Sequence, residues 1–286
     1  MDEAASDYLP SFELGEPLSG WAVGEVVASA SPRFALGDQV LHPQGWRQYA
    51  VLDAAVEPPL GPEPILVDSS TPAKAYVGPL GWVGLTSWVG LLDVAELRDG
   101  DVVFVSGAAG AVGSLAVQVA KLRGHFVIAS AGSAAKVNYV REELGADLVF
   151  SYRDGPVGEQ LPALVPDGID LYFDNVAGEH LEAALASLRP GGRVALCGAI
   201  STYNDADKPP GPRNLFEATA KGLTLRGFLA RMYAHRMEDF RREMRAGLAA
   251  SIVYPETVFE GLERAPEALI AQLRGENVGK VLVSLD

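Results

Sequence analysis

Three glycines spaced three residues apart separate an apolar strand from an apolar helix in VFVSGAAGAVGSLAVQVAKLRG, from Val103 to Gly124. In such a turn the first free N–H groups of the helix point at whatever occupies the turn, and the helix dipole favours an anion there. Gly107 and Gly110 would permit a tight turn and close backbone approach, and Gly113 would let the helix press against its strand. The turn is therefore suited to a pyrophosphate.

The spacing of these glycines is GxxGxxG rather than the commoner GxGxxG, so the motif alone is also compatible with a plain loop. The motif follows the first strand of a run of strand-helix units, and this context favours dinucleotide binding. No lysine follows the last glycine directly, which excludes a P-loop.

The next strand, HFVIAS, distinguishes the two nicotinamide cofactors. An NAD site normally ends this strand with Asp or Glu, which accepts hydrogen bonds from the ribose. Here the strand continues into AGSAAK, which offers Ser133 and Lys136 and no acid. One charge-assisted hydrogen bond from Lys136 to a 2′-phosphate would contribute ~1.5 to 3 kcal/mol, about a 10- to 100-fold preference for NADPH. The alternative is that Lys136 is an ordinary solvated lysine.

The elements that position these residues alternate along the chain from about Gly84. Short Val- and Leu-rich segments such as DVVFVS, DLVFSY and GGRVALCGAI alternate with helical segments, which predicts an α/β fold with a doubly wound parallel sheet. The chain before that point is β-rich, in GWAVGEVVASA and LHPQGWRQYAVLD. We expect helices near 179–188, 215–221 and 231–250, and a final segment that returns to the β-rich part.

Composition excludes several classes of protein. The 286 residues are 48% hydrophobic, enough for a large core, and a net charge of -14 leaves no basic surface for nucleic acid. The uncharged run 77–92 is shorter than the roughly 20 apolar residues of a membrane span, and we expect a buried domain junction there. The N-terminus is acidic, unlike a signal peptide, which predicts a cytoplasmic protein. A single cysteine, Cys197, excludes an internal disulfide and a Cys-rich zinc site.

One family resemblance covers nearly the whole chain, in the ordered segments FELGEPLSGWAVGEVVAS, GWRQYAVLD, PLGWVGLTSWVGLL, VSGAAGAVGS, GSAAKVNYVREELGAD, FDNVAG, CGAISTYN, GPRNLF, LTLRGFL and VFEGLERAPEALIAQLRGENVGKVLVSL. The chain resembles the zinc-independent branch of the medium-chain dehydrogenase/reductase superfamily that contains leukotriene B4 12-hydroxydehydrogenase and prostaglandin reductase. This resemblance implies a Rossmann NADP-binding domain over 81–254 and a β-rich, GroES-like catalytic domain over 1–80, to which 255–286 return. It also implies NADPH, a homodimer, and metal-free hydride transfer to the β-carbon of α,β-unsaturated ketones and aldehydes.

The same resemblance assigns cofactor contacts by position. At the pyrophosphate it implies Ala111, Val112 and Gly113, in the turn that begins with Gly107 and Gly110. The remaining matched positions are Lys136 and Tyr152, with Ser133 beside them, at the 2′-phosphate; Asn175 at the ribose; Cys197, Gly198, Ile200, Ser201 and Tyr203 beside the nicotinamide; Phe228 and Leu229 at its amide; and Asn277 in the terminal loop.

Enone reduction also needs a group that meets the charge developing on the enolate oxygen. Tyr203, in the Pro-rich loop after the fifth strand of the parallel sheet, is the candidate protein group. It would either donate a proton or orient ribose or substrate, and orientation is favoured because a phenol with a pKa near ~10 is a slow acid at neutral pH. Cys197 follows an apolar strand and is expected to be a buried small residue rather than a nucleophile. With four scattered histidines, it cannot form the site of a zinc alcohol dehydrogenase.

The chain departs from the family at its N-terminus. Relatives begin with further residues, including the first strands of the catalytic domain and part of the substrate-pocket wall. We expect a start upstream of Met1 or a trimmed chain, rather than a protein that functions without that segment, because FELGEPLSGWAVG keeps the pattern of a strand that needs neighbours. Two alternatives remain open: a quinone reductase of the same superfamily, and a cofactor-binding protein without turnover. The segments GPRNLF and GENVGK favour the enone reductase over the quinone reductase.

Overall fold

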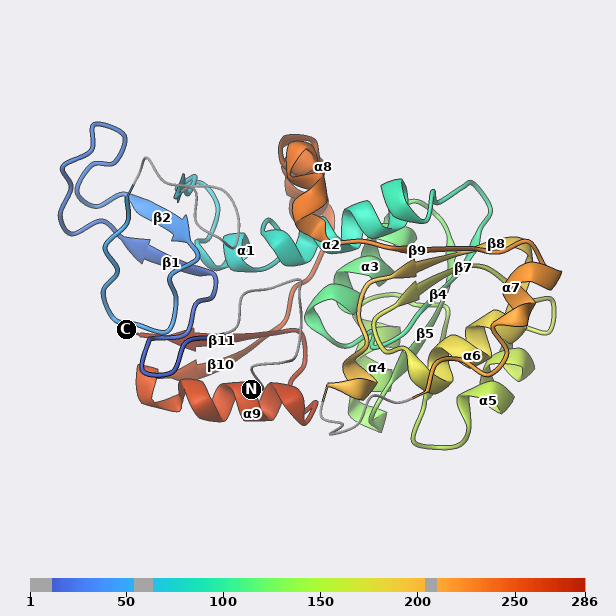
Figure 1. Cartoon of the computed structure of the whole chain (residues 1–286). Coiled ribbons are helices and arrows are strands. Elements are labelled where there is room, and N and C mark those ends of the chain that lie inside the picture. The colour runs from blue at the N-terminus through green and yellow to red at the C-terminus, as the bar shows by residue number, and fades with distance from the viewer. Residues whose placement is uncertain (1–11, 54–63, 204–209, 286) are drawn as a thin grey trace.

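A six-stranded parallel sheet forms where apolar strands alternate with helices (Figure 1). It is seen in a computed structural model that describes residues 12–53, 64–203 and 210–285. The spatial order β6-β5-β4-β7-β8-β9 has two halves that diverge from β4, the order of a doubly wound Rossmann sheet, so the predicted α/β fold is confirmed. The strands are β4 (Val102–Val105), β5 (Phe126–Ala131), β6 (Leu148–Ser151), β7 (Ile169–Asp174), β8 (Leu188–Leu196) and β9 (Thr224–Gly227).

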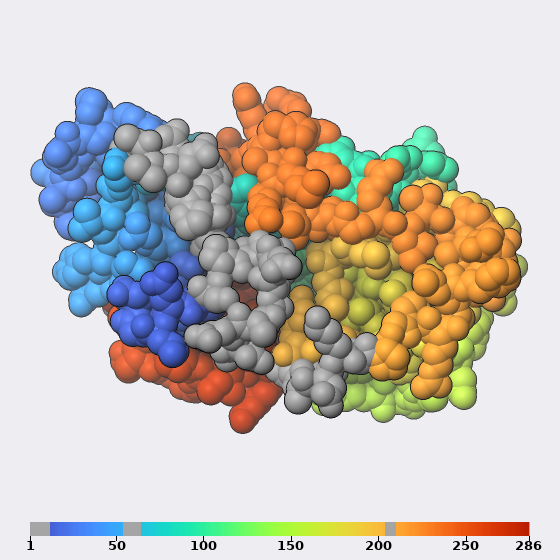
Figure 2. Space-filling view, viewed as in Figure 1, coloured from blue at the N-terminus to red at the C-terminus, as the bar shows by residue number. Residues whose placement is uncertain are grey.

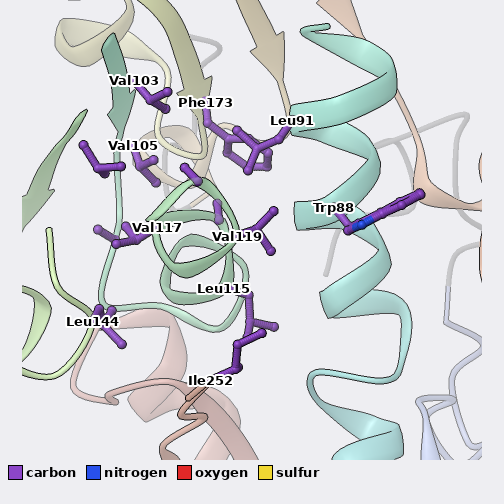
Figure 3. Close-up of a cluster of buried hydrophobic side chains, with 14 of the residues drawn as sticks. Trp88, Leu91, Val103, Val105, Leu115, Val117, Val119, Leu144, Phe173 and Ile252 are labelled. Carbon is purple, nitrogen blue, oxygen red and sulfur yellow. The ribbon is translucent and has the colours of Figure 1, made fainter. Parts of the chain in front are cut away.

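Alternate side chains of these strands point to opposite faces of the sheet and build two separate cores. Val103, Val105 and Phe173 belong to the core on the face that α2 and α3 cover (Figure 3). Their chain neighbours Phe104 and Tyr172 stack on each other, with ring centroids 4.9 Å apart, in the core that α5 and α6 cover. The helices of this region are α2 (Trp82–Val89), α3 (Ala111–Leu122), α4 (Ala134–Glu142), α5 (Val157–Leu164), α6 (Gly178–Ser187), α7 (Phe216–Ala220) and α8 (Met237–Ala250).

Two smaller sheets lie outside the parallel sheet. The N-terminal one is antiparallel, in the order β1-β2-β3. The other pairs β10 with β11 in parallel, and Figure 1 shows it with α9 on the same side of the molecule as the N-terminal strands. In Figure 2 the N-terminal strands and the α7–β9 edge lie at opposite ends of the molecule. The elements are β1 (Ala22–Glu25), β2 (Gln39–His42), β3 (Ile65–Leu66), α1 (Lys74–Val77), β10 (Glu256–Glu260), α9 (Ala265–Leu273) and β11 (Lys280–Ser284).

The run 77–92 is mostly buried, as expected, and within it α2 continues directly into a π-helix over Gly90–Val94. Two local predictions differ from the structure. The predicted helix 231–250 begins as a 3-10 helix over Ala230–Arg236 and is α-helical only in α8. The β-rich segment after His42 forms no further strand before residue 54.

No helix in the described ranges has the length and apolar character that a membrane crossing requires.

Candidate functional site

The glycine turn between β4 and α3 has a backbone that larger residues could not adopt. Gly107 has φ +59°, in the left-handed region that favours glycine. A Cβ atom on Gly113 would overlap the Gly107 carbonyl oxygen and lie 2.8 Å from the Cα of Ala108. The missing side chain of Gly113 therefore lets the first turn of α3 lie directly on the loop that follows β4.

This packing leaves the N-terminus of α3 facing the turn. The first α-helical hydrogen bond of α3 runs from Ser114 N–H to the Gly110 carbonyl, at 2.9 Å. The N–H groups of Ala111, Val112 and Gly113 precede that bond and have no intrahelical acceptor. Three donors at the positive end of a 12-residue helix fit a pyrophosphate.

The residues predicted at the 2′-phosphate meet at the carboxyl ends of β5 and β6. Ser133 caps α4, because its hydroxyl accepts a hydrogen bond from Lys136 N–H at 3.3 Å. A Cβ on Gly132 would overlap the Tyr152 hydroxyl and lie 2.7 Å from its Cζ, so the tyrosine ring lies against the end of β5. In this way the chain brings Ser133, Lys136 and Tyr152 together.

A second cation lies beside Lys136. Burial lowers the pKa of the Lys136 ammonium, and the positive charge of Arg153 lowers that pKa further. Arg153 follows Tyr152 directly, in the turn after β6. Arg153 is not among the residues predicted at the 2′-phosphate, although an arginine directly after Tyr152 is a usable signal in the sequence. Two cations and a serine hydroxyl are the donor set that a 2′-phosphate dianion requires.

A buried histidine, His180, packs against Tyr152, one of the residues predicted at the 2′-phosphate. His180, on α6, places Nε2 3.1 Å from the Ser130 hydroxyl, and its ring meets Tyr152 edge to face at 5.4 Å. Burial lowers the pKa of His180 to about 4. The imidazole is therefore neutral at physiological pH and contributes packing and a hydrogen bond rather than a charge.

Asn175, predicted at the ribose, follows β7 and is fixed by the residue that precedes the glycine turn. Its side-chain amide donates to the Ser106 carbonyl at 2.8 Å, and its backbone N–H donates to the Ser106 hydroxyl at 3.1 Å. The Tyr172 hydroxyl lies 2.9 Å from the Ser106 hydroxyl and donates to Asp174 Oδ1 at 2.7 Å. The glycine turn and the Asn175 loop are thus joined by one buried polar network.

Asp174 holds the loop after β7 in a strained conformation. Its Oδ1 accepts hydrogen bonds from the N–H groups of Val176 at 2.9 Å and Ala177 at 2.7 Å. Ala177 has φ +62° and ψ −153°, a region that is almost exclusive to glycine. Burial raises the pKa of the Asp174 carboxyl, although these hydrogen bonds oppose the shift. Strain held by a buried acid at the end of a parallel strand is typical of a ligand site.

The loop predicted beside the nicotinamide is attached to the same region. Cys197 and Gly198 donate their backbone N–H groups to the Asp174 carbonyl at 2.9 and 3.0 Å. The Ser201 hydroxyl donates to the Val176 carbonyl at 2.6 Å, and the N–H of Ile200 donates to the Asn175 carbonyl at 3.2 Å. The loop from 197 to 203 is therefore fixed against the loop that carries Asn175.

Tyr203 is at the exposed end of that loop. Its side chain is 58% exposed, and its hydroxyl accepts a hydrogen bond from the Ala199 N–H at 3.4 Å. Cys197, by contrast, packs against the core. Burial and the nearby charge of Asp174 raise the pKa of its thiol to about 12, so the thiol is protonated at neutral pH. Between these two residues, only Tyr203 presents a polar side chain to a ligand.

The C-terminal loop crosses the glycine turn from the other side. Gly279 donates its N–H to the Ala109 carbonyl at 2.8 Å, and Gly110 and Gly279 form an isolated β-bridge. Asn277 turns its side-chain amide to the Gly279 carbonyl, at 2.8 Å. Asn277 therefore lies close to the predicted pyrophosphate position.

Phe228 and Leu229, predicted at the nicotinamide amide, directly follow β9. Phe228 is buried at the end of β9, next to Gly90, and meets Tyr233 edge to face at 6.3 Å. Leu229, the next residue, is half-buried.

Within the part of the chain that the structure describes, no group of three His, Cys, Asp or Glu side chains has a metal-binding arrangement.

Comparisons with known proteins identify the family of the chain. Residues 1–57 match the family described as N-terminal domain of oxidoreductase, and residues 111–246 match the family described as zinc-binding dehydrogenase. The NADP(+)-dependent 2-alkenal reductase of Nicotiana tabacum is 37% identical over 285 residues, which cover 99% of this chain and 81% of the relative. The NADPH-dependent curcumin reductase of Escherichia coli is 36% identical over 282 residues, which cover 96% and 80%.

Among solved structures, CurA from Vibrio vulnificus in complex with NADPH superposes with a TM-score of 0.91 and is 34% identical. The match covers 100% of this chain and 84% of that one. The agreement extends over both small sheets and the parallel sheet, because no part of the chain is left out of the alignment. The chain belongs to the medium-chain dehydrogenase/reductase superfamily, with the NADP-dependent alkenal and curcumin reductases among its relatives.

Proposed function

We propose that this protein uses NADPH to reduce the C=C bond of α,β-unsaturated ketones and aldehydes by hydride transfer to the β-carbon. The observation that carries the proposal is the pairing of two sites at neighbouring strand ends. One is the N-terminus of α3 at the glycine turn, and the other is the Ser133–Lys136–Tyr152 cluster with Arg153. The relatives named for NADP-dependent alkenal and curcumin reduction support the same cofactor and the same substrate class.

The chain's own residues would bind and orient the reactants. The N–H groups of Ala111, Val112 and Gly113 bind the pyrophosphate, and Lys136 with Arg153 neutralises the 2′-phosphate. The nicotinamide, when bound, supplies the hydride. Tyr203 presents a hydroxyl that would orient ribose or substrate as charge develops on the enolate oxygen.

We assign these roles to two domains. Residues 81–254 would form the Rossmann NADP-binding domain, and 1–80 with 255–286 would form a partial GroES-like catalytic domain. The separation of the parallel sheet from the two small sheets supports this division.

A homodimer is part of the proposal, because β9 is an edge strand whose backbone can pair with a second copy. Light scattering should give twice the 30.2 kDa mass of one chain.

The function is tested by mixing the purified protein with NADPH and a linear enone and following the loss of NADPH absorbance. The expected result is oxidation of NADPH with formation of the saturated ketone. Turnover only with quinones would move the assignment to the quinone reductases of the same superfamily. NADPH binding without oxidation by either substrate would leave a cofactor-binding protein without turnover.

The role of Tyr203 is tested by Tyr203→Phe. If the hydroxyl orients ribose or substrate, kcat/KM for the enone should fall by less than the ~10²-fold minimum expected for loss of a proton donor. The dissociation constant of NADPH, measured by fluorescence, separates a ribose contact from a substrate contact. Unchanged turnover would remove Tyr203 from the site altogether.

A further inference from the structure

Lys136, the residue proposed to bind the 2′-phosphate, makes a contact outside its own proposed domain. Lys136 Nζ donates a hydrogen bond to the Gly275 carbonyl at 2.7 Å. Gly275 lies 139 residues further along the chain, in the loop between α9 and β11. The cation that would recognise NADPH is therefore already attached to the C-terminal part of the protein.

Gly275 is a favourable acceptor for an ammonium group because it follows the end of a helix. Its N–H bonds back to the Gln272 carbonyl at 3.0 Å, and its φ of +65° turns the chain out of α9. The carbonyl groups at the end of α9 carry the negative pole of the helix dipole. Lys136 thus binds the negative end of one element, while its own loop belongs to the parallel sheet.

The loop from 274 to 279 has a second attachment at its far end. Gly279 donates to the Ala109 carbonyl at 2.8 Å, in the glycine turn. One end of the loop therefore contacts Lys136, and the other end contacts the glycine turn that is proposed to bind the pyrophosphate. The loop therefore spans the two proposed sites for the 2′-phosphate and the pyrophosphate of NADPH.

Lys136 has hydrogen-bonding capacity left for a second acceptor. An ammonium group has three N–H donors, and within the described ranges Lys136 Nζ forms no ion pair with a carboxylate. The side chain of Arg153 is exposed nearby, and the only hydrogen bond that the described residues give Arg153 is from its backbone N–H to Ser151. A phosphate between these cations could bind Lys136 without displacing the Gly275 carbonyl.

We infer that Lys136 bridges the cofactor 2′-phosphate and the Gly275 carbonyl, so that the 2′-phosphate of NADPH, which NADH lacks, orients the ammonium group that already contacts the loop 274–279 and stabilises this loop further. The inference rests on the proposed function only in taking NADPH as the ligand. A phosphate dianion near the C-terminal end of α9 would be repelled by the negative pole of the helix dipole. The Lys136 ammonium between them is attracted both to the phosphate and to the Gly275 carbonyl, which offsets this repulsion. Lys136 is then a specificity-determining residue through loop position as well as through direct binding.

Hydrogen exchange of the backbone amides in 274–279 tests the inference in the full-length protein, with saturation by NADPH or NADH confirmed by fluorescence. With NADPH, exchange in this loop should be about tenfold slower than with NADH, as expected for one charge-assisted hydrogen bond. Lys136→Met should abolish the difference between the cofactors, and Lys136→Arg should restore part of it. Arg274→Gln, which removes an exposed cation in the same loop, should leave the difference unchanged.

Three results would overturn the inference. Equal protection by NADPH and NADH in the unmodified protein would show that the 2′-phosphate does not reach the loop through Lys136. A difference that survives Lys136→Met, or that is lost in Arg274→Gln, would assign the contact to another residue. Failure of NADPH to bind at all would overturn the proposed cofactor as well, whereas binding without turnover would leave the inference standing.

Discussion

The parallel sheet and the N-terminal sheet differ in how completely they bury their apolar side chains. Leu171 in β7 and Phe104 in β4 are fully buried, with layers of helix on both faces of the sheet. In the N-terminal part, Leu14 and Val51 are 96% and 91% exposed. Burial of large apolar side chains therefore stabilises the parallel sheet far more than the N-terminal part.

This difference is also a difference between the two halves of the proposed reaction. The cofactor residues follow strands of a buried sheet, and a network through Ser106, Tyr172 and Asp174 fixes them. Tyr203, the only protein group proposed to act on the reacting atoms, is on an exposed loop. Because residues 1–80 are proposed to form part of the catalytic domain, cofactor binding should tolerate changes in the N-terminal part better than turnover does.

The contrast can be measured directly with one matched pair of substitutions. Leu171→Ala removes a fully buried side chain and should lower the free energy of unfolding by about 2 to 5 kcal/mol. Leu14→Ala removes an exposed one and should change it by less than about 0.5 kcal/mol. Urea titrations followed by circular dichroism give both values. Comparable losses would mean that Leu14 is covered in solution.

The pH dependence of unfolding gives a second test of burial in the parallel-sheet region, because His180 on α6 is buried there. Its pKa falls from 6.5 to about 4 on folding, so the unfolded chain binds more protons between these values. The contribution of the neutral imidazole is complete above pH 6.5 and is lost as the pH falls toward 4, at a total of about 3 kcal/mol. Unfolding titrations at several pH values should show this loss in the unmodified protein. His180→Gln, which keeps an amide toward Ser130 but does not titrate, should lack it; an identical pH profile would contradict the burial of a neutral ring.

The smallest effect concerns the glycine turn. Gly113→Ala forces a methyl group onto the Gly107 carbonyl and should destabilise the protein by about 1 to 3 kcal/mol and weaken NADPH binding. Gly158→Ala, in α5, meets no atom within 4 Å and should be neutral or stabilising by up to about 1 kcal/mol. Melting temperatures and NADPH titrations of both variants test the pair. Equal effects would show that the turn can relax around a side chain.

Strands β4 to β7 could be predicted because each is a largely apolar run that is followed by a helix. The prediction of one long helix from 231 was less accurate, since its first turns form a 3-10 helix in which Tyr233 has non-helical backbone angles and packs against Phe228. The segment after His42 has β-forming residues, but apart from one isolated bridge between Gly20 and Gln44 it pairs with no strand in the described ranges.

The candidate site shows the same division between local and distant causes. The glycine turn and the cap of α4 by Ser133 depend on a few consecutive residues, so their positions could be predicted from the sequence. The contact of Lys136 with Gly275 joins segments far apart in the chain, and no local pattern encodes it. Arg153, by contrast, could have been predicted locally, because it directly follows Tyr152 in the sequence.

The bond between Gly279 and Ala109 joins two backbone atoms and uses no side chain of either loop. Mutation can therefore alter almost any neighbouring side chain without erasing this attachment, so it is robust to evolutionary drift. Gly279 itself is the exception, because it has φ +67° and a Cβ there would overlap the Pro255 carbonyl. Homologues could thus diversify the residues that face their substrates while the C-terminal loop stays anchored to the nucleotide turn.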